Sequence, residues 1–169
     1  SLMNRNYTSA DFENIINKVR CAMPDVGITT DIMVGFPGET QQDFIDTYNL
    51  ISKIKFSRLH VFRYSPRKGT PAEKMSGKVP PYISDQRSHE IISLGNRLAR
   101  EFQLQWLGKE MSVLIEDIRE GKDKLLAGFT SNYIRVLVAD ATNEHIGKLV
   151  PVRLIDIENN YMIGSISKT

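Results

Sequence analysis

The chain has 169 residues, of which 41% are hydrophobic and 25% charged, and its formal net charge is +2. This composition is that of an ordinary globular protein and argues against disorder. No window approaches the roughly 20 apolar residues of a membrane span, and the first residues lack the apolar core of a secretory signal, so we expect no membrane association. Cys21 is the only cysteine, which excludes a disulfide within the chain and favours a cytoplasmic protein with a buried, inert thiol.

The first thirty-odd residues predict a helix followed by a strand. Thr8 has the position of an N-cap, and Asp11, three residues later, completes the spacing of a capping box. Apolar residues then recur at helical spacing, and this pattern ends near Met23 and Pro24. Residues 28–34 are apolar and partly β-branched, which predicts a buried parallel strand.

A tight turn, a second helix and a second strand follow. The turn residues let the backbone bend with nothing bulky in the way; they are Gly35, Pro37 and Gly38. Thr40 and Asp43 again have capping-box spacing, before a helix from about residue 43 to residue 54. Residues 56–64 are rich in aromatic and β-branched residues, which predicts the second strand. Because helices and strands alternate, we expect right-handed β-α-β connections and a parallel sheet.

Beyond residue 64 a loop leads to a long helix and then to a region of different periodicity. The loop, residues 65–81, has 17 residues and is long enough to be functional. Residues 83–107 carry apolar side chains at helical spacing. After Gly108 the period changes to two, and five short strands predict a small β-barrel. We expect these strands at residues 111–118, 125–130, 134–138, 147–157 and 161–166.

Two parallel strands with three helices cannot bury a sheet on both faces. The first part of the chain therefore either ends a larger α/β domain or borrows strands from a neighbour, and we interpret it as the end of a larger domain. In isolation, the open edge of the strand at residues 28–34 predicts self-association through the truncated α/β part, residues 1–107.

The residues themselves offer few candidates for catalysis. The three histidines are scattered without metal-ligand spacing, and no Ser/His/Asp or Cys/His set is evident. For Asp31, in the middle of the first strand, we favour a buried carboxylate bonded to backbone over a general base or ligand group. A ligand over residues 35–39 would meet Tyr64 and Ser65 at the carboxyl end of the second strand. The alternatives are a turn whose glycines serve only the backbone, and a Tyr64 that is a packed core aromatic.

One basic segment stands out from the rest of the sequence. Between Asp46 and Glu73 there is no acidic residue, while six basic residues fall there: Lys53, Lys55, Arg58, Arg63, Arg67 and Lys68. This segment is a candidate surface for a polyanion, with a solvated basic loop as the alternative. The β region has no such excess, since residues 108–169 hold eight Lys and Arg against nine Asp and Glu.

Two stretches together resemble the radical S-adenosylmethionine methylthiotransferases. They are TTDIMVGFPGET at residues 29–40 and, sixteen residues on, FSRLHVFRYSPRKGTPAEKM at residues 56–75. MNRNYT at residues 3–8 is similar to the stretch that opens this segment in the family, and the β region resembles the TRAM domain that closes these enzymes. The segment FSRLHVF is most similar to the subgroup that acts on threonylcarbamoyladenosine in transfer RNA (tRNA).

This resemblance implies a fold of the class α/β plus all-β. Residues 1–82 would be the C-terminal part of a radical SAM (β/α)6 partial barrel, residues 83–107 a linker helix, and residues 108–169 a five-stranded, OB-like TRAM β-barrel. The motif departs from the family's general G-x-I-x-G-x-x-E form, with Asp31 at the first glycine and Glu39 one place late. The resemblance assigns the contacts with S-adenosylmethionine to Met33, Gly35, Phe36, Pro37, Gly38, Tyr64 and Ser65.

The resemblance also implies a parent enzyme with two [4Fe–4S] clusters. One cysteine cannot ligate a cluster, so we expect no metal site and no catalytic residue in this chain, and no activity from it alone. The parent would cleave S-adenosylmethionine to a 5′-deoxyadenosyl radical and add a methylthio group to C2 of N6-threonylcarbamoyladenosine, next to the anticodon. The alternatives are a methylthiotransferase that acts on isopentenyladenosine in tRNA or on a ribosomal protein, and a non-catalytic RNA-binding module.

For contact with tRNA, the barrel offers side chains that suit single strands. Tyr133 can stack on a base, with Asn132 and Arg135 beside it. From the basic segment we add Arg63, Arg67 and Lys68, which lie close to the end of the second strand.

Overall fold

The computed structural model describes residues 3 and 5–167, so residue 4 of the MNRNYT stretch lies outside the described residues. The chain divides into two compact units, Ser1–Leu98 and Ala99–Thr169, and the boundary falls within one helix. Among the described residues no helix is both long and apolar enough to cross a membrane.

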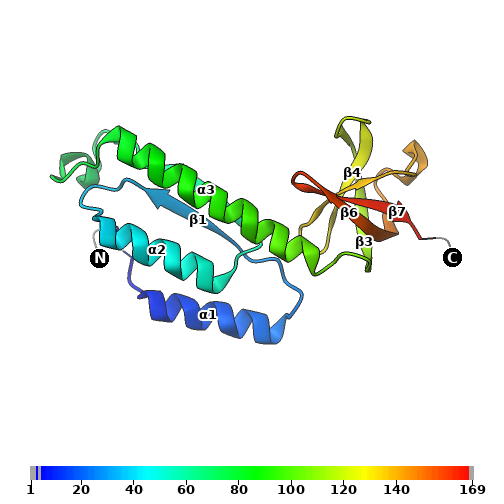
Figure 1. Ribbon diagram of the computed structural model, residues 1–169, viewed down its shortest axis with the longest axis horizontal. Helices are drawn as coiled ribbons and strands as arrows, with labels where there is room; N and C mark the ends of the chain where they lie inside the picture. Colours follow the sequence, from blue (N-terminus) through cyan, green and yellow to red (C-terminus); the bar gives the residue numbers. More distant parts are fainter. Residues whose placement is uncertain (1–2, 4, 168–169) are drawn as a thin grey trace. The chain divides into compact units, whose positions relative to one another are not determined.

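The first unit alternates helices and strands, as the sequence predicts (Figure 1). Its elements are α1 (Ser9–Ala22), β1 (Thr29–Val34), α2 (Gln41–Ile54), β2 (Arg58–Arg63), the 3₁₀ helix η1 (Pro71–Lys74) and α3 (Pro81–Leu104). β1 and β2 pair in parallel along their whole length, which confirms the predicted β-α-β unit. The predicted helix at residues 83–107 is real but lies two to three residues nearer the N-terminus.

Both predicted capping boxes are present and fix where α1 and α2 begin. The Thr8 hydroxyl accepts the N–H of Asp11 at 3.2 Å, and the Asp11 carboxylate accepts the N–H of Thr8 at 2.9 Å. Thr40 and Asp43 repeat the arrangement at 3.1 and 2.8 Å. The bonds from the threonine side chain and backbone hold the pKa of both aspartates below the ordinary value.

One face of the β1–β2 sheet carries the core of this unit. The buried side chains come from the end of β1, from the residues just before β2 and from all three helices. They are Ile16, Val34, Phe44, Ile51, Ile54, Phe56, Ile91, Leu94 and Leu98. Figure 1 shows β1 between α2 and α3 in this view, and side chains of all three elements contribute to the same core. The core thus joins α3 directly to the strand that precedes the glycine turn.

No described element covers the other face of the sheet. Met33 is 42% exposed and its cross-strand neighbour Phe62 51% exposed. Asp31 lies on this same face, beside His60, and is exposed. The prediction that Asp31 is buried is therefore wrong, because side chains alternate along a strand and the helices cover only one face.

Cys21 is exposed, so the prediction of a buried thiol is also wrong. α1 buries only Ile16 among its described residues. Cys21 follows five positions later, which places it about 140° around the helix from Ile16, away from the buried stripe.

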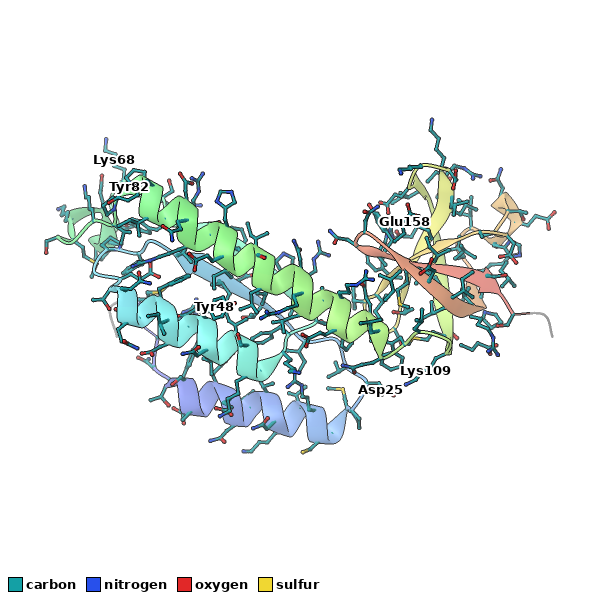
Figure 2. All side chains as sticks on the ribbon, viewed as in Figure 1. Asp25, Tyr48, Lys68, Tyr82, Lys109 and Glu158 are labelled. Atoms are coloured by element: carbon teal, nitrogen blue, oxygen red, sulfur yellow. The ribbon has the colours of Figure 1, made fainter. Side chains whose placement is uncertain are left out.

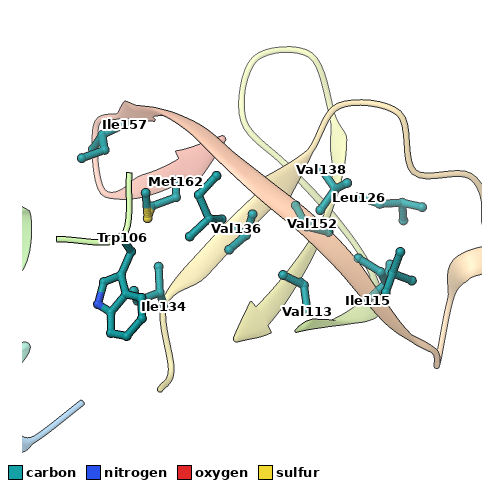
Figure 3. Close-up of a cluster of buried hydrophobic side chains, with 12 residues drawn as sticks. Trp106, Val113, Ile115, Leu126, Ile134, Val136, Val138, Val152, Ile157 and Met162 are labelled. Carbon is teal, nitrogen blue, oxygen red and sulfur yellow. The ribbon is translucent and has the colours of Figure 1, made fainter. Parts of the chain in front are cut away.

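The second unit contains the predicted five-stranded β-barrel. Its elements are β3 (Glu110–Glu120), β4 (Leu125–Thr130), β5 (Arg135–Val138), the 3₁₀ helix η2 (Asn143–His145), β6 (Leu149–Glu158) and β7 (Tyr161–Ile166). The strands close in the order β3-β4-β5-β7-β6, with β5 and β7 parallel and the other pairs antiparallel. Figure 3 shows apolar side chains from these strands meeting inside the barrel, with Trp106 at one end. The barrel therefore has its own core and no open strand edge.

Candidate functional site

The turn between β1 and α2 is tightly enclosed. Gly35 and Gly38 have φ of +78° and +88°, a region that side chains other than glycine rarely adopt. A Cβ atom on Gly35 would overlap the hydroxyl of Ser84, so α3 packs directly on the turn. Gly38 in turn donates its N–H to the carbonyl of Gly77 at 2.9 Å. The glycines are thus needed for close approach as well as for the turn itself.

Glu39 and Arg87 form a buried ion pair inside this turn. Their side chains are only 12% and 6% exposed, and Arg87 Nη1 lies 3.2 Å from the Glu39 carboxylate. The same carboxylate accepts the N–H of Gly35. Arg87 also donates to the Glu39 carbonyl at 3.3 Å and to the Gln41 side chain at 3.2 Å.

Sequence reasoning missed Arg87, although a signal was present. Arg87 falls on the same stripe of α3 as Ile91 and Leu94, at i, i+4 and i+7 spacing, and all three are buried. A charged residue on the buried stripe of a helix requires a partner, and that partner is the Glu39 carboxylate.

The predicted cofactor residues lie at the carboxyl ends of β1 and β2. Tyr64 donates its N–H to the Val34 carbonyl at 2.8 Å, which ties the two strand ends together. The rings of Phe36 and Tyr64 meet edge to face with centroids 5.2 Å apart. Pro37 is buried and Ser65 exposed. The structure thus brings Phe36 and Tyr64 together, while Met33 lies on the open face of the sheet.

The turn does not have the chemistry of a phosphate cradle. The N–H groups of Gly35 and Asp43 are already bonded to the side chains of Glu39 and Thr40. The Asp43 carboxylate, which accepts the N–H of Thr40, also stands at this turn and would repel an anion. By contrast, the paired rings of Phe36 and Tyr64 suit a neutral or cationic ligand with a flat ring.

The buried hydroxyl of Tyr64 is a further sign of fit for such a ligand. It has no hydrogen-bond partner among the described residues. An unsatisfied buried polar group is destabilising by about 1–3 kcal/mol, so a polar group that arrives beside it is favoured. No group of three or more His, Cys, Asp or Glu in the described part of the chain is placed to hold a metal ion.

In the barrel, Tyr133 projects from the short loop between β4 and β5. Its side chain is 78% exposed, and its backbone has a φ of +62°, which is uncommon for an aromatic residue. Thr130 holds the loop: its hydroxyl accepts the N–H of Ile134 at 2.9 Å and donates to the Asn132 side chain at 2.5 Å. Asn132 is therefore buried within the loop, while the ring of Tyr133 is presented to solvent.

Arg135 lies beneath this loop and is fully engaged. It pairs with Glu120 at 3.0 Å and with Glu116, and its guanidinium lies 4.5 Å from the centre of the Phe129 ring. Burial alone lowers the pKa of Arg135, but the bonds to Glu120 and Glu116 outweigh it and hold the pKa above the ordinary value. Phe129 in turn contacts Tyr133 at 5.9 Å between ring centroids. Arg135 thus supports the Phe129 ring, and its charge is already paired with two carboxylates rather than open to a phosphate.

The basic segment is only partly open to a polyanion. Arg63 pairs with Asp85, and Lys53 pairs with Glu13 at 2.6 Å. Arg67 and Lys68 are exposed in the loop after β2. Figure 2 shows Lys68 and Tyr82 at the N-terminal end of α3, and Tyr82, which sequence reasoning missed, is 71% exposed.

No family model matches the chain. A tRNA-2-methylthio-N(6)-dimethylallyladenosine synthase of Acetivibrio thermocellus is 40% identical over 98% of this chain and 34% of its own length. A second such synthase, of Lachnoclostridium phytofermentans, is 35% identical over 96% of the chain and 35% of its own length.

A third relative carries a different name. The threonylcarbamoyladenosine tRNA methylthiotransferase MtaB of Bacillus subtilis is 39% identical over 96% of this chain and 36% of its own length. The chain thus spans about a third of the length of these relatives. Identity of 35% to 40% along nearly all of its residues shows that the chain belongs to the tRNA methylthiotransferase family.

Proposed function

We propose that this chain is the C-terminal part of a radical S-adenosylmethionine methylthiotransferase that adds a methylthio group to C2 of N6-threonylcarbamoyladenosine in tRNA. The observation that carries the proposal is the alignment of 96% of the chain with a relative named as a threonylcarbamoyladenosine tRNA methylthiotransferase. The enclosed glycine turn and the closed β-barrel support it, because one offers a wall for an adenine ring and the other a platform for RNA.

In this proposal residues 1–82 complete a radical SAM partial barrel, residues 83–107 link it to the next domain, and residues 108–169 form a TRAM domain. S-Adenosylmethionine and two [4Fe–4S] clusters, bound in the whole enzyme, supply the radical and sulfur chemistry. This chain's own residues bind and orient the nucleoside. Met33 and Phe36 pack on the adenine ring, the backbone from Gly35 to Gly38 borders it, and Tyr64 and Ser65 meet its polar edge.

The tRNA contacts come from both units. Tyr133 stacks on an unpaired base, with Asn132 fixing the loop and Arg135 supporting the ring beneath. Arg67 and Lys68 contact phosphates, and Arg63 joins them if it releases Asp85. Because the barrel itself has no excess of basic residues, recognition there depends on stacking more than on charge.

The cluster ligands provide the first test. Sequencing the gene upstream of residue 3 should reveal three cysteines in a C-x3-C-x2-C run and further cysteines before it. An upstream region without such cysteines would instead identify a non-catalytic RNA-binding module.

The substrate needs a separate test, because relatives named for two different nucleosides are 40% and 39% identical to this chain. The gene should be deleted and the tRNA nucleosides measured by mass spectrometry. We expect the loss of 2-methylthio-N6-threonylcarbamoyladenosine. Loss of the methylthio form of isopentenyladenosine would reassign the substrate, and intact tRNA with a lost methylthio group on a ribosomal protein would reassign the class.

A further inference from the structure

The Glu39–Arg87 ion pair is a poor means of stabilising a fold. Removing two charges from water is expensive, and replacing a buried pair by apolar side chains is often neutral or stabilising. Arg87 is only 5% exposed, and its Nε is buried without a hydrogen-bond partner among the described residues. The pair therefore calls for an explanation other than net stability.

The contacts of Arg87 fix several separate points of one short turn. Through the Glu39 carboxylate the pair holds the N–H of Gly35, and Arg87 also bonds the carbonyl of Glu39 and the side chain of Gln41. Its guanidinium lies 5.4 Å from the centre of the Phe44 ring in α2. Only a planar group with several donors can make these contacts at once, which a lysine cannot do.

α3 presses on the same turn at a second point. Ser84, three residues before Arg87, occupies the space where Gly35 would carry a Cβ atom. Gly77 also accepts the N–H of Gly38, so the turn is held at a third point. The backbone of residues 35–39 is thus prevented from rearranging when a ligand arrives.

We propose that Arg87 is a positioning residue for S-adenosylmethionine: acting through Glu39, it holds residues 35–39 in the shape that accepts the adenosyl group. This inference rests on the proposed function. Because Arg87 neutralises Glu39, the Asp43 carboxylate is the negative charge beside the turn, and it favours a cationic nucleoside such as S-adenosylmethionine over a nucleotide. A fixed wall lowers the ordering cost of binding and keeps the nucleoside in one orientation.

The test compares Arg87→Met, Arg87→Lys and Glu39→Gln in the full-length protein. The matched controls are Arg97→Met and Glu90→Gln, which make the same chemical changes at exposed positions of α3. We expect the dissociation constant for S-adenosylmethionine, measured by equilibrium dialysis, to rise about tenfold in Arg87→Met and Glu39→Gln. Arg87→Lys should fall between these variants and the wild type, and the controls should bind like the wild type.

Two further readouts separate positioning from general destabilisation. The KM for S-adenosylmethionine should rise in Arg87→Met while the KM for tRNA stays unchanged. Without ligand, amide hydrogen exchange should accelerate at residues 35–41 in Arg87→Met and Glu39→Gln and stay unchanged in the barrel.

Several outcomes would overturn the inference. Wild-type affinity in folded Arg87→Met and Glu39→Gln would do so, as would a uniform acceleration of exchange along the whole chain. If Arg87→Met does not fold, Arg87→Lys and Glu39→Gln decide by the same criteria. A wild-type protein that does not bind S-adenosylmethionine at all would reject the proposed function together with this inference, whereas equal binding by wild type and variants would reject this inference alone.

Discussion

At the scale of single residues, the backbone conformation of Tyr133 bears on the proposed contact with RNA. Its φ of +62° is costly for any residue other than glycine, by roughly 1 kcal/mol. A tyrosine that is 78% exposed at such a position gains little from burial in return. The proposed role in stacking on a base would account for an aromatic residue at this position.

Substitution of Tyr133 separates these two roles. Tyr133→Gly should leave the free energy of unfolding unchanged or raise it by up to about 1 kcal/mol, because glycine adopts this backbone without strain. The same variant should weaken tRNA binding by about 1–3 kcal/mol, and Tyr133→Phe should bind normally. Urea denaturation and filter binding measure the two quantities. Normal tRNA binding by a folded Tyr133→Gly variant would reject the stacking role and leave Tyr133 with a role in the turn alone.

The salt dependence of binding distinguishes Tyr133 from the exposed lysines. Arg135 is committed to Glu116 and Glu120, so the platform beneath Tyr133 should release no counterions from RNA. Lys68→Ala should reduce the slope of log affinity against log salt by about 1, and Tyr133→Phe should leave the slope unchanged. Titrations at several salt concentrations measure the slopes. An unchanged slope in Lys68→Ala would remove this loop from the RNA contact surface.

Contacts between neighbouring residues could be predicted from the sequence, whereas contacts between distant residues could not. The capping residues Thr8 and Thr40 could be predicted because their bonds are local, three positions along the chain. The partnership of Glu39 with Arg87 joins positions 48 apart and depends on how α3 packs, so spacing alone does not reveal it. Asp31 was mispredicted for the same reason, since the covered face of a sheet is decided by tertiary packing.

At the scale of elements, the two capping boxes make the α/β unit sensitive to acid. The folded pKa of Asp11 and of Asp43 lies below the ordinary value, about 3.9 for an unfolded aspartate. Their contribution to stability is therefore complete above that pH and is lost as the pH falls through the lowered folded values. The double variant Asp11→Asn, Asp43→Asn should be less stable than the wild type at pH 6 and lose less stability on acidification.

Urea denaturation at pH 6, 4 and 3 checks this, with Asp46→Asn as the control, since no capping contact involves Asp46. Parallel pH curves for wild type and double variant would contradict the assignment.

In the barrel, burial raises the pKa of Asp140, but bonds from Ile166 and Ser165 outweigh it and lower the pKa. Asp140 should therefore add an acid-sensitive contribution of the same sign there.

The elements themselves followed from periodicity. A change from helical spacing to alternation at Gly108 predicted the barrel, and its strands at Leu125–Thr130 and Tyr161–Ile166 match the prediction to the residue. Strand ends elsewhere differ by a few residues, because ladder bonds with a neighbour, rather than the residue's own propensity, decide where a strand stops. The parallel pairing of β5 with β7 has no signal in the sequence, since it depends on how the barrel closes.

At the scale of the whole molecule, the two units differ in how they end their sheets. The barrel closes on itself, so each of its strands has two neighbours. The sheet of the other unit has only β1 and β2 and leaves one face uncovered among the described residues, with Met33 and Phe62 side by side. Unpaired strand edges and solvent-exposed apolar side chains favour association between copies. The free energy gained is roughly 25 cal/mol per Å² of apolar surface removed from water.

We therefore expect this 169-residue chain to self-associate, and to do so through the α/β unit. Sedimentation at micromolar concentration should show a dimer or larger species for the wild type. Phe62→Lys places a charge on the uncovered face and should shift the protein to monomer. Leu149→Lys makes a comparable change at a 71% exposed position of the barrel and should leave association unchanged. A wild type that sediments as a monomer would show that the uncovered face is tolerated in water, and loss of association in Leu149→Lys alone would move the contact to the barrel.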